Sequence, residues 1–282
     1  MLGKFKREIT VFLAFAVCFI GSGAHAGPFF SVNIASDELV RIESTTGAVS
    51  VVGALGTDAI DIDLTRTADG RLWGLNSNFG SRVDLLEIST STGAVLSTTQ
   101  VNLSGIQNAE GLGHSGNQLT IGHSVNSSAS NFFSELATDG TISNSIQTSV
   151  DIDGMSAGSG TTPYYLLDAA LIGAWRTLIH TFDPSIPSSS QIANILTGSE
   201  PIGNDLVIDG TDIFYIDGGI TPELFNSSLA SPGTAGSIDL DRAGSYRGLA
   251  IGTSVAVAEP GMLLGFASGL AIFGVIRRRR RR

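Results

Sequence analysis

Short runs of alternating apolar and polar residues fill the middle of the chain, and turn-forming residues separate them. The clearest example is a pair of segments 46 residues apart, residues 39–49 (LVRIESTTGAV) and 85–95 (LLEISTSTGAV). Similar turns fall at residues 138–142, 184–187 and 231–234. Because apolar residues alternate on both sides of these turns, each turn is predicted to connect two antiparallel strands.

A second series of turns lies between these hairpins, and each turn leads into another strand, at residues 69–75, 116–121, 162–168 and 209–217. One more strand precedes each of these turns, at residues 62–65, 110–113, 153–157 and 205–208, and a last one lies at 246–251. Four short strands in each unit of about 40 to 50 residues are the pattern of a β-propeller. The sequence therefore predicts an all-β fold.

The two ends of the repeated region predict how the ring closes. The strand at residues 246–251 lacks the strand that follows it in the other units, and residues 29–33 match that missing strand. Pairing them completes a fifth blade and removes the open edge of the array. The repeat resembles those of NHL-type and quinoprotein-like propellers over most of residues 28–252, which implies an architecture and no particular chemistry. A β-sandwich is the alternative fold.

Charge is strongly segregated along the 282 residues. Nine of the 16 basic residues lie in the terminal segments, so residues 27–258 hold 24 acidic residues, seven arginines and no lysine, a net charge of 7 − 24 = −17. Such a domain is a poor partner for nucleic acid. The one cysteine, Cys18, lies near the N-terminus, so the domain is expected to hold no disulfide.

The N-terminal 26 residues have the pattern of a signal peptide. Lys4, Lys6 and Arg7 precede an apolar run at residues 9–20, and Ala24 and Ala26 supply the small residues that signal peptidase requires. The sequence predicts cleavage after Ala26 and export of a mature protein that begins at residue 27.

The C-terminal 25 residues contain three parts in succession. Ala258-Glu259-Pro260 is followed by an uncharged apolar stretch at residues 261–276 and then by six arginines at 277–282. As a helix the stretch is about 24 Å long, slightly short of a hydrocarbon core of about 30 Å. We expect a transmembrane helix in the inner membrane, with the arginines in the cytoplasm and the acidic domain on the far side.

This three-part tail resembles the PEP-CTERM sorting signal of Gram-negative bacteria, in which a Pro-Glu-Pro motif precedes a short helix and a basic cluster. The resemblance implies that an exosortase cleaves near residues 258–260 and that the protein is released to the cell surface or extracellular matrix. Ala258 stands where the motif has its first proline. The alternative is an ordinary membrane anchor. The expected domains are the leader (1–26), the propeller (27–257) and the sorting signal (258–282).

Acidic residues recur at one equivalent position of the predicted innermost strands, which hold Asp63, Glu110, Asp153 and Asp205, with Arg247 in the fifth. Innermost strands line the central channel of a propeller, where several carboxylates repel one another unless a proton, an arginine or a cation neutralises them. Because the donors are all oxygens, calcium is the natural metal for this ring. The alternative is structural: each carboxylate accepts hydrogen bonds from backbone N–H groups of the neighbouring blade.

The remaining motifs favour a protein without catalytic activity. The chain has no Gly-x-Ser-x-Gly nucleophile motif and no phosphate-binding loop. We expect a binding or structural module whose partner is an exopolysaccharide or a matrix protein. The competing class is a carbohydrate-active hydrolase or lyase that uses two of the channel acids. Two weaker possibilities are a histidine pair, His114 and His123, and a sugar platform built from the aromatic residues Trp73, Tyr164, Tyr165, Trp175, Phe214 and Tyr215.

Overall fold

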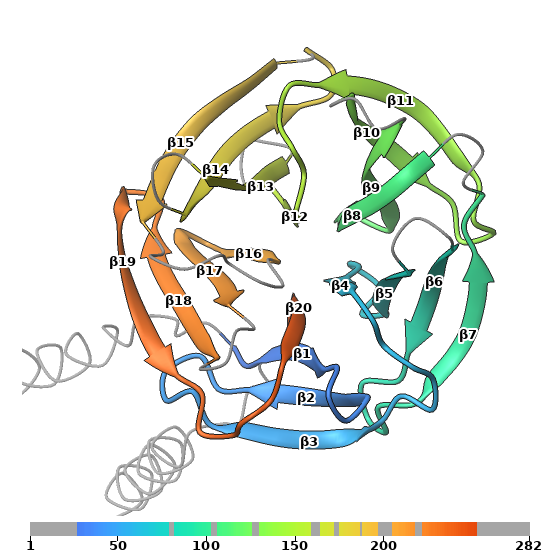
Figure 1. Ribbon diagram of the computed structural model, residues 1–282, viewed down its shortest axis with the longest axis vertical. Coiled ribbons are helices and arrows are strands. Elements are labelled where there is room, and N and C mark those ends of the chain that lie inside the picture. The colour runs from blue at the N-terminus through green and yellow to red at the C-terminus, as the bar shows by residue number, and fades with distance from the viewer. Residues whose placement is uncertain are drawn as a thin grey trace, which may run out of the picture. The chain divides into compact units, whose positions relative to one another are not determined.

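Five four-stranded antiparallel sheets surround a central axis and form a five-bladed propeller (Figure 1). The computed structural model describes residues 27–78, 82–102, 106–125, 130–158, 164–171, 175–186, 188–196, 205–217 and 222–252. All helices and strands assigned within these residues are β-strands. The first strand of each sheet in the order below is nearest the axis (Figure 1). The predicted fold is thus confirmed, and the β-sandwich alternative was wrong.

The bounds of the strands, given from the axis outward, are as follows. Blade 1 contains β20 (Tyr246–Ile251), β1 (Phe29–Asn33), β2 (Glu38–Ile42) and β3 (Val49–Ala54). Blade 2 contains β4 (Ile62–Arg66), β5 (Leu72–Asn78), β6 (Arg82–Ile88) and β7 (Val95–Gln100), and blade 3 contains β8 (Ile106–Ser115), β9 (Gln118–Val125), β10 (Asn131–Leu136) and β11 (Ile142–Thr148). Blade 4 contains β12 (Gly154–Ala157), β13 (Tyr164–Leu171), β14 (Trp175–Asp183) and β15 (Ser188–Leu196), and blade 5 contains β16 (Leu206–Asp209), β17 (Asp212–Asp217), β18 (Glu223–Ser228) and β19 (Ser231–Asp239).

The hydrophobic core is divided among the junctions between blades. Leu39 is buried against blade 2 whereas its neighbour Val40 is buried against blade 5, because successive side chains of a strand point to opposite faces. Leu86 and Leu85 divide in the same way between blades 1 and 3. Both faces of each blade are therefore covered, which explains the paired apolar residues in the middle of the repeats.

Blade 1 joins the two ends of the described region. β20 pairs with β1, so that Phe29 lies opposite Ile251 and Asn33 lies opposite Tyr246. Beyond the strands, the Gly252 N–H donates to the Pro28 carbonyl at 2.7 Å. The predicted closure of the ring by N-terminal and C-terminal strands is confirmed.

The glycine of the repeated hairpin turn packs against the outer strand of the preceding blade. Gly47, Gly93 and Gly140 have φ angles of 70°, 77° and 83°, a conformation that favours glycine. A Cβ atom added to Gly93 would lie 2.4 Å from the Gly53 carbonyl oxygen, and one added to Gly140 would lie 2.3 Å from the Gln100 carbonyl oxygen. The turn glycine therefore serves both the hairpin and the junction between blades.

Several predictions differ from the structure or lie outside it. The turn predicted at residues 231–234 is part of β19, and the chain reverses earlier, at Leu229 and Ala230. The leader (1–26) and the sorting signal (258–282) lie outside the described residues, as does the turn at 162–163. Within the described residues no helix has the length and hydrophobicity needed to cross a membrane.

Replacing Gly93 by alanine tests the contact between turn and blade. We expect Gly93→Ala to lower the free energy of unfolding by about 2 to 5 kcal/mol, because backbone strain and a collision with Gly53 add. Gly56→Ala is the matched control, since Gly56 has φ of 76° and nothing within 4 Å of the added Cβ, and should cost about 1 to 2 kcal/mol. Urea denaturation of both variants measures the difference, and equal losses would contradict the packing role.

Candidate functional site at the central channel

The structure places the four predicted acids around the axis, near the inner strands of four blades. Asp63 lies in β4 and Glu110 in β8, whereas Asp153 and Asp205 immediately precede β12 and β16. Asp63 interacts electrostatically with Asp205 and Glu110. Asp153 interacts with Glu110 in turn. The predicted convergence of these carboxylates is therefore present.

Asp205 is the most buried of these acids and connects several blades. Its side chain is 0% exposed. One carboxylate oxygen accepts the Leu206 N–H at 2.7 Å, and the other accepts the N–H groups of Leu64 at 3.0 Å and Leu249 at 2.8 Å. These donors lie in blades 5, 2 and 1. Burial raises the pKa of Asp205 to about 7, although the hydrogen bonds from backbone N–H groups oppose the rise.

Asp63 makes a similar contact with the next blade. Its carboxylate accepts the Gly111 N–H of blade 3. Burial raises the pKa of Asp63 well above its usual range, and the nearby charges of Asp205 and Asp61 raise it further. For Asp63 and Asp205 the structural alternative is thus confirmed, because both carboxylates bind backbone N–H groups of other blades.

Asp153 departs from this pattern. Its carboxylate accepts the Ala169 N–H at 2.6 Å, and Ala169 belongs to the same blade. Burial raises the pKa of Asp153, and the carboxyl group of Glu110, which is hydrogen-bonded to it, raises the pKa further. Glu110 in blade 3 and Asp153 in blade 4 therefore connect neighbouring blades through their side chains.

Arg247 supplies positive charge to the acidic ring. Its Nε atom lies 3.5 Å from a carboxylate oxygen of Asp61, in the next blade. The pKa of Asp61 is raised by burial, and the charge of Arg247 opposes this rise. An arginine was one of the groups predicted to neutralise the acidic ring. Arg247 does so for Asp61, at the edge of the ring.

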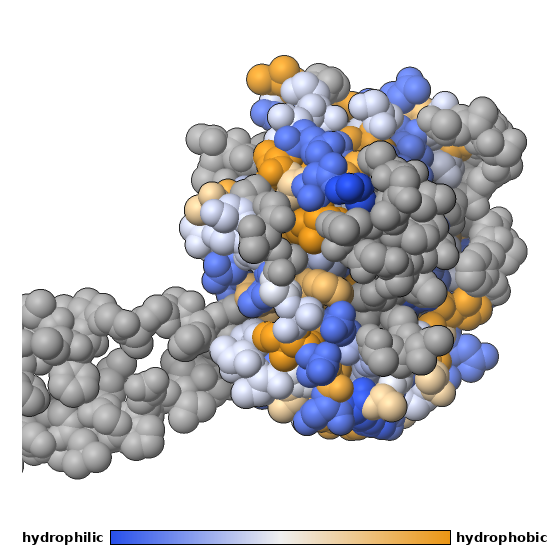
Figure 2. All heavy atoms as spheres, turned by 60° about the vertical axis from the view of Figure 1, so that its left-hand side comes forward, coloured by the Kyte–Doolittle hydropathy of each residue, from blue (hydrophilic) through white to orange (hydrophobic). Residues whose placement is uncertain are grey.

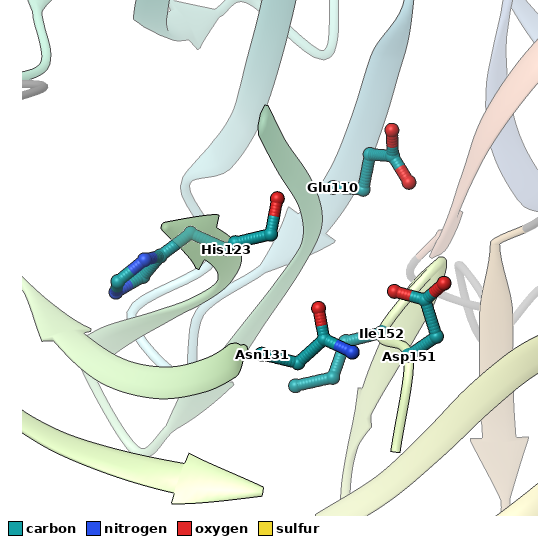
Figure 3. Close-up of a pocket in the computed structure, with 6 residues that line it drawn as sticks. Glu110, His123, Asn131, Asp151 and Ile152 are labelled. Carbon is teal, nitrogen blue, oxygen red and sulfur yellow. The ribbon is translucent and has the colours of Figure 1, made fainter. Parts of the chain in front are cut away.

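A small pocket opens beside the ring between blades 3 and 4, lined by Glu110, His123, Ser124, Asn131, Asp151 and Ile152. The carboxylates of Glu110 and Asp151 lie on one side of it, whereas the His123 ring points away from them (Figure 3). Its space for the centre of a water molecule is about 20 Å³. That volume suits a water molecule or a small ion and is too small for a sugar ring.

The structure describes no complete set of metal ligands. Among its described residues, no three histidine, cysteine, aspartate or glutamate side chains are grouped so that they could hold a metal ion. Calcium binding by Asp63, Glu110, Asp153 and Asp205 remains a prediction.

The two weaker possibilities do not fit the structure. His114 lies opposite Leu119 and His123 opposite Ala109, so the two histidines occupy distant rungs of one hairpin and bind no common ligand. His123 instead contacts the Ser134 hydroxyl at 2.8 Å, and burial lowers its pKa to about 4. The aromatic side chains of the supposed platform are buried in the core at Trp73, Tyr164, Tyr165, Phe214 and Tyr215; that of Trp175 lies outside the described part.

Sequence reasoning did not single out Asp168, which interacts electrostatically with Asp151, one of the residues that line this pocket. Burial raises the pKa of Asp168 to about 6, and the charge of Asp151 adds to the effect. Asp168 lies in β13, the second strand of its blade, and Asp217 ends β17, the matching strand of blade 5. The search for repeated acids covered only the innermost strands, so it did not include Asp168.

Comparison with known proteins identifies the fold and no family. No family model matches the chain, and no curated protein does. A chain in a crystal structure of a nidogen/laminin complex is 11% identical, with a TM-score of 0.52, and the match covers 80% of this chain and 98% of that one. The strand order defines the class of this domain, a five-bladed β-propeller, and the similarity supports the fold alone.

Two further solved structures are more distant. The structure of the Dos1 propeller is 11% identical, with a TM-score of 0.37, over 75% of this chain and 55% of that one. Bacteroides ovatus xyloglucan PUL GH43B is 16% identical, with a TM-score of 0.45, over 63% of this chain and 40% of that one. Neither similarity is close enough to transfer an activity.

Removing the Asp205 carboxylate tests whether it holds the blades together. Asp205→Ala leaves the N–H groups of Leu64, Leu206 and Leu249 without this acceptor, and we expect a loss of about 3 kcal/mol or more of unfolding free energy. Asp209→Ala, at the other end of β16, should change it by less than about 0.5 kcal/mol. Denaturant titration measures both, and a small loss in Asp205→Ala would contradict the bridging role.

The raised pKa of Asp205 predicts a pH effect of definite sign. Because the folded pKa is about 7 and the unfolded value is about 4, protonated Asp205 stabilises the fold at low pH, and this contribution is lost as pH rises through 7. Asp205→Asn cannot ionise, so its stability relative to wild type should improve by about 2 to 3 kcal/mol between about pH 5 and about pH 8.

The variant must be compared with wild type at each pH, because three histidines also titrate in this range. Burial lowers the pKa values of His114, His123 and His180, so their contribution to stability increases as pH rises, whereas that of Asp205 decreases. Asp69→Asn is the control. Hydrogen bonds from Thr67 and Arg71 lower the pKa of Asp69, so its difference from wild type should stay constant over the same range. A constant difference for Asp205→Asn as well would contradict the assignment.

Proposed function

We propose that this protein is an exported, non-catalytic propeller that serves as a binding or structural module at the cell surface or in the extracellular matrix. The absence of catalysis is inferred from the hydrogen bonds that the channel acids make with the backbone. Asp63, Asp153 and Asp205 each accept a backbone N–H, so these carboxylates organise strands. Residues engaged in this way are poorly placed to attack or protonate a substrate.

The size of the neighbouring pocket supports the same proposal. A glycosidase needs two carboxyl groups on either side of a bound sugar. Glu110 and Asp151 share a pocket, but the space in it for the centre of a water molecule is only about 20 Å³, which leaves no room for a sugar between them. The hydrolase or lyase alternative therefore lacks a substrate site at the acids from which it was inferred.

Export and sorting rest on the two ends of the sequence. The leader with Ala24 and Ala26 directs the chain across the inner membrane, where signal peptidase removes it. The tail with Ala258, Glu259 and Pro260 then holds the protein transiently at that membrane and presents it to an exosortase. The last described residue, Gly252, lies six residues before this motif, so cleavage there would leave every described strand in the released protein.

Mass spectrometry of the protein from an exosortase-containing host tests this route. We expect the secreted wild type to begin at Gly27 and to end near residues 258–260. Glu259→Ala and Pro260→Ala should keep the arginine tail and stay with the membrane, because the recognition motif is broken. Ser254→Ala, just outside the motif, is the control and should be released normally, and Ala258→Pro should be released at least as completely as wild type.

Two outcomes would contradict the proposal. Extracellular wild type that retains residues 261–282 would rule out processing of the tail. Turnover of a host exopolysaccharide by the purified exported protein, lost in Glu110→Gln or Asp151→Asn, would establish the hydrolase instead.

A further inference from the structure

The outermost strands of the propeller form a belt around its rim, and we call β3, β7, β11, β15 and β19 the outer belt (Figure 1). Each of them is the last strand of its sheet and is paired on one side only. The free side of such a strand presents backbone N–H and C=O groups that can pair with another strand.

Parts of the outer belt are joined end to end. The Val95 N–H at the start of β7 donates to the Leu55 carbonyl, directly after β3, at 3.0 Å. The Asn102 N–H, just beyond β7, donates to the Gly140 carbonyl in the turn before β11 at 2.9 Å. β3, β7 and β11 belong to three separate sheets, and these hydrogen bonds connect their edges end to end across blades 1 to 3.

Four of the five outer belt strands lack two of the features by which proteins prevent edge pairing, whereas β19 contains Pro232 and Asp239. Charged side chains, lysine above all, and proline are the common protection. β3 (VSVVGA), β7 (VLSTTQ), β11 (ISNSIQT) and β15 (SSSQIANIL) contain neither. The net charge of −17 on residues 27–258 therefore resides outside these four strands, and two copies can meet at their edges without placing carboxylates of these strands opposite each other.

Exposed hydrophobic residues mark the same edge. Among the described residues only three large hydrophobic side chains are exposed, Val51 (45%), Leu96 (63%) and Ile186 (66%). Val51 lies in β3 and Leu96 in β7, so two of the three lie on the connected edge of blades 1 and 2. On the side formed by blades 4 and 5, hydrophobic residues are scattered among polar ones (Figure 2).

We propose that the protein associates with further copies of itself through antiparallel pairing of outer belt strands, chiefly β3 and β7. A second copy is the partner that these observations favour, because identical uncharged strands are self-complementary about a two-fold axis. One pair of such short strands makes a small and weak contact. Several edges on each molecule can link copies into an extended network.

Sedimentation velocity of the exported protein, purified from its host, tests the proposal over a wide range of concentration. We expect wild type to form oligomers as concentration rises. Leu96→Lys and Leu96→Glu should each weaken association about tenfold or more, because identical charges then face each other across the contact. The two variants change net charge in opposite directions, so a general charge effect would move them apart.

Ile186→Lys and Ile186→Glu are the matched controls, since they make the same change at an exposed hydrophobic residue in a turn. They should associate like wild type, and all variants should keep the wild-type melting temperature. Wild type that stays monomeric at every concentration would overturn the proposal. So would association that Leu96 variants leave unchanged, or that Ile186 variants abolish equally. None of these outcomes depends on processing of the tail.

Discussion

The whole ring depends on the contacts that hold its innermost strands together at the axis, and the carboxylate of Asp205 makes several of these contacts. It is completely buried and accepts N–H groups from Leu64, Leu206 and Leu249, in three different blades. Innermost strands have a free edge toward the channel, so their N–H groups need an acceptor there. One carboxylate on the axis satisfies several of them, which a hydrophobic side chain could not do.

This arrangement explains why a domain without disulfides tolerates so many acids near its centre. Asp63 binds Gly111 of the next blade, Arg247 approaches Asp61, and Glu110 is hydrogen-bonded to Asp153. Most of these contacts run from one blade to the following one, so they reinforce the hydrophobic junctions between blades. Charge that resembles an active site in sequence is therefore largely structural.

Most of the fold could be predicted from the sequence because the repeat is physically constrained. Gly47 and Gly93 recur at a fixed spacing since each must adopt a positive φ and fit against the preceding blade. The position of the acids could also be predicted, but their bonding could not. Asp63 directly precedes the buried Leu64, whereas Gly154 separates Asp153 from the buried Met155, and the two carboxylates bind the next blade and their own blade, respectively. Asp168 lies in a second strand, outside the innermost strands in which repeated acids were sought.

The pairing of β20 with β1 has a consequence for how the chain folds. Phe29 and Ile251 lie opposite each other although 222 residues separate them, and contacts of such long range are slow to form because the intervening chain must first be ordered. Blades 2 to 5 are each continuous in sequence and can form as the chain emerges. Blade 1 must wait for its last strand, so its completion is the step that converts an open arc into a ring and during which the unfinished protein is most exposed to proteases.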